Sequence, residues 1–373
     1  MVRARAVVVP FLLLGSLLAQ EAFPESATLR EFTQRSELVS RFWGRDRAIR
    51  AGVVLPPDLR ADERLPVCYS IHGFGGSHRS AIRLHDRLQA GMKDGGTPRM
   101  LYVFLDAQFS LGHHEFADSV NNGPWGEALT TEFVPALENE FHAFGKPAGR
   151  FLTGHSSGGW SSLWLQVAYP EFWNGTWSTA PDPVDFRDFT GIDIYRFDNA
   201  FVDPDGQPVQ LMRKNGEWVA TIRQFVEGEM SQGDHGGQFM SFNAVFSPRG
   251  DDGRPMSLFD TRTGKIDRAV AERWRKYDIA DVLRSNWQTL GPKLAGKLHV
   301  YVGTQDTFRL EGAVRLLQAD LQKLGSDAQF VFAEGRDHGT LFNVHAELWP
   351  DGMVERIHRE MRARFDAATA NGR

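Results

Sequence analysis

The chain has 373 residues, of which 42% are hydrophobic, and a formal net charge of -5. This length and hydrophobic content suffice for a large packed core, and the lack of a basic excess argues against nucleic acid as a partner. Cys68 is the single cysteine, which excludes an intrachain disulfide. Its place in an apolar run predicts a buried strand residue, not a reactive thiol.

Residues 1–19 have the pattern of a secretory signal peptide. Arg3 and Arg5 precede an apolar run from Ala6 to Leu18, and Ala19 suits cleavage. The run is shorter than the roughly 20 residues of a membrane-spanning helix, which disfavours the alternative of an uncleaved anchor. We therefore expect a secreted or periplasmic bacterial protein with no stable membrane span.

After a polar stretch at residues 20–36, which we expect to be a loose leader, predicted strands and helices alternate. The strands are expected at Glu37–Trp43, Ala48–Leu55, Pro66–Ile71, Met100–Asp106, Arg150–Gly154, Trp173–Ala180, His299–Gly303 and Gln329–Ala333. The helices are expected at Glu127–Phe144, Ser157–Tyr169, Leu310–Leu324 and Val354–Ala367. This alternation predicts one α/β domain over residues 37–373, with a mainly parallel sheet between two layers of helices.

Residues 181–291 interrupt the alternation. Two turn signals within them, Pro204-Asp205-Gly206 and Asn215-Gly216, predict a small β element inserted into the domain. The insertion leaves the strand that follows the 157–169 helix. Because parallel strands end on the side where α/β proteins bind ligands, we expect part of it to cap the substrate pocket. A surface decoration far from the site is the alternative.

The segment Gly154-His155-Ser156-Ser157-Gly158 has the form G-x-S-x-G. In a nucleophile elbow the serine occupies a strained strand-to-helix turn, and side chains two residues before and after it would clash. An ordinary glycine-rich turn is the alternative, but the predicted strand before it and helix after it favour a catalytic Ser156.

An acyl-transfer serine also needs donors for the developing oxyanion. The backbone N–H of Ser157 is one candidate, because the first N–H groups of a helix lack intrahelical partners. The second is expected from the glycine-rich loop at residues 72–76, from Phe74 first and from Gly75 second. A plain glycine turn is the alternative for this loop.

In α/β folds that carry such a nucleophile elbow, the catalytic residues follow the order serine, acid, histidine along the chain. Asp306 follows the predicted strand 299–303, and His338 follows the strand 329–333. Taken singly, Asp306 could be a helix N-cap and His338 a surface loop residue, but their order and strand-end positions favour a triad. Asp337 is interpreted as a loop residue. The adjacent pair His113-His114 is not expected to bind a metal, because neighbouring strand residues point to opposite faces.

Four segments together resemble the putative-esterase family of α/β-hydrolases, which includes S-formylglutathione hydrolases, feruloyl esterases, enterochelin-type esterases and mycolyltransferases. These segments are residues 66–76, Asp118-Ser119-Val120-Asn121-Asn122-Gly123-Pro124-Trp125-Gly126, the 154–158 elbow and Gly303-Thr304-Gln305-Asp306. The resemblance covers about residues 37–180 and 278–345. It implies serine ester hydrolysis without a cofactor, with Ser156, Asp306 and His338 at the family's nucleophile, acid and base positions. The long 181–291 interval and the Gly339-Thr340-Leu341-Phe342 sequence after His338 depart from the family pattern.

We expect a small-molecule or carbohydrate-linked ester as substrate, with Gly75, Trp125 and His155 at the substrate site. Two alternatives stay open from the sequence. One is acyl transfer to a sugar or alcohol acceptor, and the other is a catalytically silent binding protein with the same fold.

Overall fold

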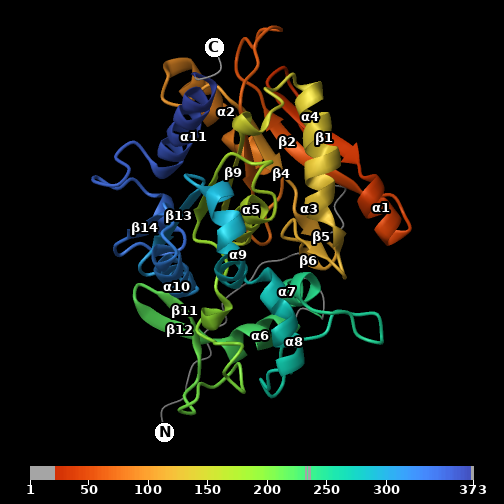
Figure 1. Cartoon of the computed structure of the whole chain (residues 1–373), viewed down its shortest axis with the longest axis vertical. Helices are drawn as coiled ribbons and strands as arrows, with labels where there is room; N and C mark the ends of the chain where they lie inside the picture. Colours follow the sequence, from red (N-terminus) through yellow and green to blue (C-terminus); the bar gives the residue numbers. More distant parts are fainter. Residues whose placement is uncertain (1–21, 232, 234–236, 371–373) are drawn as a thin grey trace.

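The computed structural model describes residues 22–231, 233 and 237–370, so the expected signal peptide lies outside the described residues. Its centre is an eight-stranded sheet with strand order β1-β2-β4-β3-β9-β10-β13-β14 (Figure 1). The strands are β1 (Leu29–Arg35), β2 (Ala48–Val54), β3 (Val67–Ile71), β4 (Leu101–Leu105), β9 (Arg150–His155), β10 (Thr176–Thr179), β13 (Leu298–Gly303) and β14 (Gln329–Ala333). From β4 to β14 all neighbours are parallel, whereas β2 is antiparallel to both β1 and β4. The predicted mainly parallel sheet is confirmed.

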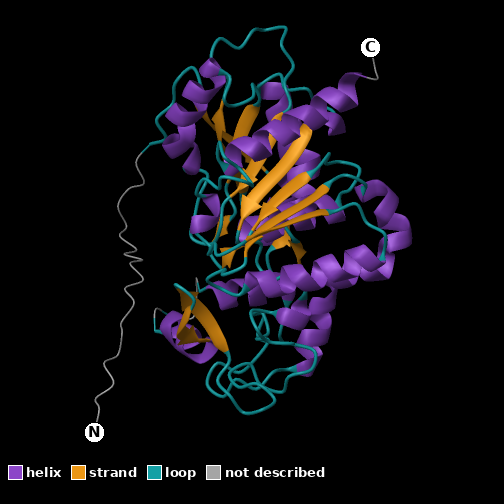
Figure 2. Ribbon diagram, turned by 90° about the vertical axis from the view of Figure 1, so that its left-hand side faces the viewer, coloured by secondary structure: helices purple, strands orange, loops and turns teal. Residues whose placement is uncertain are grey.

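Helices cover both faces of the sheet (Figure 2). They are α1 (Glu37–Trp43), α2 (Ser80–Asp94), α3 (Trp125–Ala128), α4 (Val134–Glu140), α5 (Ser157–Ala168), α9 (Ile279–Leu294), α10 (Leu310–Lys323) and α11 (Met353–Ala370). Adjacent register positions contact opposite layers. Tyr69 of β3 hydrogen-bonds Glu138 of α4, while Tyr102 of β4, which pairs with Cys68, packs against His358 of α11. No helix in the described part of the chain is both long and apolar enough to cross a membrane.

Two expectations for the N-terminal region are wrong. Residues 37–43 form helix α1, not a strand, because the Ser36 side chain accepts from the N–H of Val39 at 3.1 Å and Gly44 closes the helix in the left-handed conformation. The expected loose leader at 20–36 contains β1, whose residues pair with β2 in register from Leu29 opposite Val54. Helix α2 was not anticipated, and the expected 127–144 helix is divided by a π-helical turn at Leu129–Phe133.

The region from 181 onward contains the expected small β element. Strands β11 (Gln210–Lys214) and β12 (Glu217–Thr221) form a hairpin around Asn215-Gly216, both with positive φ. Helices α6 (Ile222–Met230), α7 (Gln238–Phe246) and α8 (Arg268–Trp274) gather with it at one end of the molecule (Figure 1). The expected boundary at residue 291 falls inside α9, which packs against α5 and α10 and so belongs to the main domain.

Besides the β11–β12 hairpin, the described residues form two more two-stranded sheets. The first two strands, β5 and β6, form one hairpin after β4, and β7 and β8 form another before α3. Their bounds are β5 (Gln108–Phe109), β6 (Gly112–His113), β7 (Asp118–Ser119) and β8 (Gly123–Pro124). The β5–β6 hairpin contacts α7, because the Ser241 hydroxyl donates to the carbonyl of His113 at 2.8 Å. The inserted region is therefore packed against the main domain near the ends of the central strands.

Candidate active site

Ser156 occupies the turn between β9 and α5 with φ 60° and ψ -123°, a strained backbone conformation for a residue with a side chain. A Cβ atom on Gly154 would lie 2.0 Å from the carbonyl oxygen of Gly158. A Cβ atom on Gly158 would lie 2.0 Å from the carbonyl oxygen of Ile71. Both positions therefore require glycine, and the turn has the geometry of a nucleophile elbow.

Asp306 and His338 meet at the same edge of the sheet. Asp306 is fully buried after β13, and its Oδ2 accepts from Nδ1 of His338 at 2.7 Å. Its Oδ1 accepts from the N–H of Phe308 at 2.8 Å, which fixes the carboxylate. Burial opposes the charged imidazolium, but the hydrogen bond and charge of Asp306, together with the charges of Asp182 and Asp337, raise the pKa of His338. The bond fixes the tautomer and leaves Nε2 of His338 available.

Asp337, the neighbour of His338, has a different role. Its Oδ1 accepts from the N–H of Thr340 at 2.7 Å, from the Thr340 hydroxyl at 2.7 Å and from the N–H of Gly339 at 3.1 Å. The carboxylate thus closes the turn that follows His338. This placement agrees with the interpretation of Asp337 as a loop residue.

The hydroxyl of Ser156 donates to Oδ1 of Asp182 at 3.3 Å. Oδ2 of the same carboxylate accepts from the Ser157 hydroxyl at 2.6 Å and from Nε2 of Gln238 at 3.1 Å. Within the described residues, no hydrogen bond joins Ser156 to His338. The Ser156 hydroxyl is therefore held by Asp182 in this structure.

Neither Asp182 nor Gln238 was among the residues selected from the sequence. Asp182 follows β10 by three residues, and a carboxylate directly after a parallel strand is a signal that could have identified it. Gln238 begins α7, 56 positions further along the chain. Only the folding of the inserted region brings it to the site, so no local pattern could have indicated it.

A second buried carboxyl lies close to Asp182. Burial raises the pKa of Asp182 to about 6, and the charge of Glu115 adds to this effect. Burial also raises the pKa of Glu115 to about 8, although the Ser161 hydroxyl donates to it at 2.6 Å. At neutral pH Glu115 is therefore mostly protonated and Asp182 mostly ionised, which avoids two adjacent buried negative charges.

The glycine-rich loop after β3 lies against the elbow. A Cβ atom on Gly73 would be 3.2 Å from Cβ of Ser156, so Gly73 packs against the serine. Phe74 is the next residue along the loop. Nδ1 of His72 donates to the Gly73 carbonyl at 2.8 Å, and Nε2 of His113 donates to the His72 carbonyl at 3.0 Å. These bonds fix the loop whose N–H groups were expected to face the oxyanion.

The three residues expected at the substrate site lie in different places. His155 is beside the site: its ring centroid is 4.3 Å from that of His338. Gly75 is exposed and has a φ of 75°. Trp125 is 4% exposed, donates from Nε1 to the Asn122 carbonyl at 2.8 Å and stacks on His114 at 4.1 Å. The structure therefore places Trp125 in the core, where His114 covers its ring.

The inserted region contacts both carboxylate loops. Arg213 of β11 donates from Nε to the backbone carbonyl of Asp306 at 2.8 Å and from its N–H to the Thr307 carbonyl at 2.9 Å. Arg309, three residues after Asp306, donates to the Gln210 carbonyl at 2.9 Å. Together with the bond from Gln238 to Asp182, these contacts place the hairpin and the start of α7 next to the site.

Comparison with known proteins assigns a family to one segment of the chain. Residues 44–221 match the family model described as Putative esterase. This segment belongs to the putative esterase family. A search of curated proteins found no match.

Solved structures show the same fold at low sequence identity. A ferulic acid esterase superimposes with a TM-score of 0.52 at 15% identity, covering 90% of this chain and 99% of its own. An S-formylglutathione hydrolase from Agrobacterium tumefaciens has a TM-score of 0.50 at 15% identity, with 91% and 94% covered. A fluorophosphonate-binding serine hydrolase of Staphylococcus aureus has a TM-score of 0.52 at 13% identity, with 91% and 99% covered. The chain has the α/β-hydrolase fold, as predicted.

Proposed function

We propose that this esterase-family chain hydrolyses carboxylic esters through an acyl-enzyme formed on Ser156. The observation that carries the proposal is the strained elbow at Ser156 beside the hydrogen-bonded pair of His338 and Asp306. All three residues follow parallel strands of one sheet, so they converge at one edge. A small-molecule or carbohydrate-linked ester is the proposed substrate, and export through residues 1–19 is proposed from their signal-peptide pattern.

In the proposed reaction, Nε2 of His338 takes the proton of the Ser156 hydroxyl as its oxygen attacks the ester carbonyl. Asp306 holds the imidazole in the required tautomer and stabilises the imidazolium that forms. His338 then gives the proton to the leaving alcohol, and the ester oxygen departs. Water, activated by the same imidazole, attacks the acyl-enzyme and releases the acid and free Ser156.

The backbone N–H groups of Ser157 and Phe74 are proposed to bind the oxyanion of each tetrahedral intermediate. Ser157 is the first residue of α5, where the N–H has no intrahelical acceptor and the helix dipole favours negative charge. The loop packs closely enough that a Cβ atom on Gly73 would be 3.2 Å from Cβ of Ser156, which supports its neighbour Phe74 as the second donor. Such preorganised donors stabilise the transition state more than the ground state.

The test is chemical labelling combined with turnover. A fluorophosphonate probe should label Ser156 of the purified protein, and p-nitrophenyl acetate should be hydrolysed with release of p-nitrophenol. Mass spectrometry of a peptic digest identifies the labelled residue. Labelling at Ser157 in place of Ser156, or a well-folded protein that neither labels nor turns over any ester of a short aliphatic, feruloyl and acetyl-sugar panel, would reject the proposal.

A further inference from the structure

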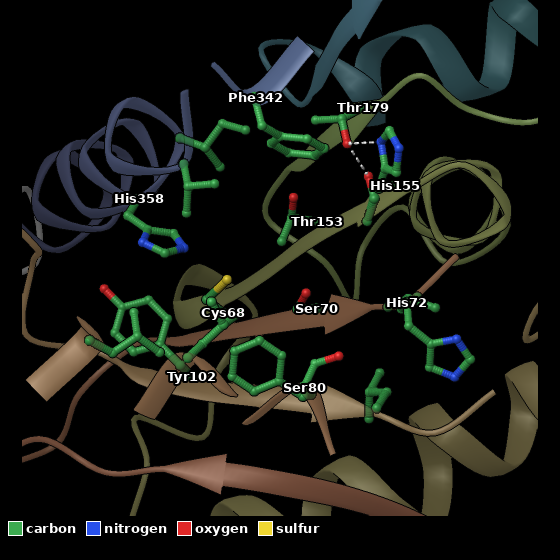
Figure 3. A pocket seen from close by; sticks show the side chains of 18 of the residues that line it. Cys68, Ser70, His72, Ser80, Tyr102, Thr153, His155, Thr179, Phe342 and His358 are labelled. Atoms are coloured by element: carbon green, nitrogen blue, oxygen red, sulfur yellow. Dashed lines mark hydrogen bonds between the residues drawn. The ribbon is translucent and has the colours of Figure 1, made fainter. Parts of the chain in front are cut away.

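A cavity of about 230 Å³ lies between the sheet and helices α2 and α11 (Figure 3). The residues that line it include Cys68, Ser70, Tyr102 and Thr153 from the strands, and Leu88 and His358 from the helices. Ser156 and His338 are not among its lining residues. The cavity is therefore separate from the place where the ester bond would be broken.

The lining of the cavity is neutral in its interior. Among its described lining residues, Arg87 and Glu355 are the only ones with permanent charges at neutral pH, and they form an ion pair with each other between α2 and α11. Burial lowers the pKa values of His72, His155 and His358, so their imidazoles are neutral. A charged ligand would lose its hydration without gaining a free counter-charge, which disfavours its entry.

His358 is a buried polar side chain directed into this space. It is 6% exposed, its ring packs on Tyr102 with centroids 4.6 Å apart, and no described residue forms a hydrogen bond with it. Figure 3 shows its imidazole entering the cavity from α11, with the hydroxyl of Ser70 on the strands below. A neutral imidazole has one donor and one acceptor, and a buried polar group without a partner is costly. The hydroxyl group of a ligand could form this missing hydrogen bond with the His358 imidazole.

One wall of the cavity adjoins the catalytic histidine. Gly154, His155, Thr179 and Phe342 form this wall. The His155 ring lies 4.3 Å from the ring of His338 and 4.8 Å from that of Phe342. A molecule in the cavity would contact His155, whose ring packs against His338.

We propose that this cavity binds a small neutral molecule with an apolar body and one hydroxyl group, such as an aromatic alcohol, and that its occupancy changes turnover through His155. Size supports this class: apolar cavities of about 150 Å³ accept benzene, so the larger volume leaves room for a substituted ring. The link to turnover rests on the proposed esterase function, whereas binding itself does not.

Binding is tested in the Ser156→Ala protein, where no turnover can interfere. Benzyl alcohol, toluene and benzoate are titrated by calorimetry and by thermal shift. We expect saturable one-site binding of benzyl alcohol, about threefold weaker binding of toluene and at least tenfold weaker binding of benzoate. His358→Phe should remove the advantage of benzyl alcohol over toluene, because the ring shape stays and the hydrogen bond is lost.

Two variants that fill the cavity from opposite walls, Ser70→Leu on β3 and Ile357→Phe on α11, should abolish binding of both ligands. Either variant suffices if it keeps the wild-type circular dichroism spectrum. Absence of saturable benzyl alcohol binding to the folded Ser156→Ala protein, or unchanged affinity in a folded cavity-filled variant, would overturn the proposed site.

The coupling is tested with the wild-type chain and p-nitrophenyl acetate. Saturating benzyl alcohol should change kcat at least twofold with little change in KM, and Ser70→Leu should not respond. Benzyl acetate formation that persists in Ser70→Leu would instead identify benzyl alcohol as an acyl acceptor at Ser156 and overturn the coupling. If the wild-type protein hydrolyses no ester while the binding results hold, the esterase proposal fails and the binding site stands.

Discussion

The loops after the neighbouring parallel strands β10 and β13 each carry a buried aspartate, Asp182 and Asp306, but the two carboxylates have different partners. Asp306 accepts from the His338 ring and from backbone N–H groups. Asp182 accepts from two serine hydroxyls and from the amide of Gln238. An imidazole can take up and return a proton near neutral pH, whereas a hydroxyl or an amide cannot. The partner, not the residue type or the strand-end position, therefore decides which aspartate can serve a triad.

The largest expected effect tests the Asp306 side of this comparison. Ser156→Ala and His338→Ala should each lower kcat/KM for p-nitrophenyl acetate by a factor on the order of 10⁴ or more, because members of a triad act as a unit. The double variant should be no worse than either single variant. Initial rates of p-nitrophenol release measure this, with thermal unfolding as the control for folding. A His338→Ala protein with a tenth of wild-type activity would assign the base to another residue.

The next effect distinguishes Asp306 from Asp337, the aspartate that directly precedes His338. Asp306→Asn should reduce kcat by about 10³-fold, because the amide can stabilise neither the correct tautomer nor the imidazolium. Asp337→Asn is the matched control, since the same change is made one residue from His338, where the carboxylate closes a turn and does not hydrogen-bond the imidazole in the described structure. It should alter kcat by no more than a few-fold. The reverse ranking would move the acid to Asp337.

The difference between the loops after β10 and β13 also shows what the sequence could predict. The elbow and the loops after β13 and β14 were predicted because their signals are local: a short apolar run followed by a glycine, an acid or a histidine. Helix α1 was missed because seven residues rich in apolar side chains fit either period, and the caps at Ser36 and Gly44 decide between them. Asp182 was not selected because the chain-order rule looks for the acid after a later strand.

The inserted region marks the limit of such reasoning. Its turn at Asn215-Gly216 is a local signal and was predicted, together with the hairpin around it. The contacts of Arg213 with the Asp306 loop and of Gln238 with Asp182 join residues 93 and 56 positions apart. Such pairs are set by packing of the whole domain, so a single sequence does not reveal them.

A smaller effect is expected from Asp182 and should be visible in the pH profile. The pKa of His338 is raised mainly by Asp306, against burial, and further by the charge of Asp182. Because the imidazole must be neutral to act as a base, kcat/KM should fall as the pH drops through a midpoint above the usual histidine value of about 6.5. Asp182→Asn removes one raising charge, so the midpoint should move to lower pH.

The same variant should also lower kcat/KM at pH 8 by about tenfold, since it weakens the hydrogen bonds from the Ser157 hydroxyl and from Gln238 that fix the loop beside Ser156. Ser157→Ala is the control: it removes one of these hydrogen bonds, keeps the charge and should leave the midpoint in place. A midpoint that stays fixed in Asp182→Asn would show that its charge does not reach His338.

The smallest effect concerns Gln238, which connects the inserted region to the Asp182 side of the site. If part of residues 181–291 caps the pocket, the contact of Gln238 with Asp182 holds the start of α7 beside Ser156. Gln238→Ala should then lower kcat/KM only about two- to fivefold for p-nitrophenyl acetate, because a single hydrogen bond from a neutral amide to the Asp182 carboxylate is lost. Its effect on bulky esters, measured as the ratio of feruloyl to acetyl ester turnover, should be larger, since a bulky acyl group needs the cap in place.

Gln224→Ala is the matched control, because that glutamine only caps α6 through Thr221. A Gln238→Ala protein whose feruloyl-to-acetyl ratio equals that of Gln224→Ala would show that α7 takes no part in substrate choice.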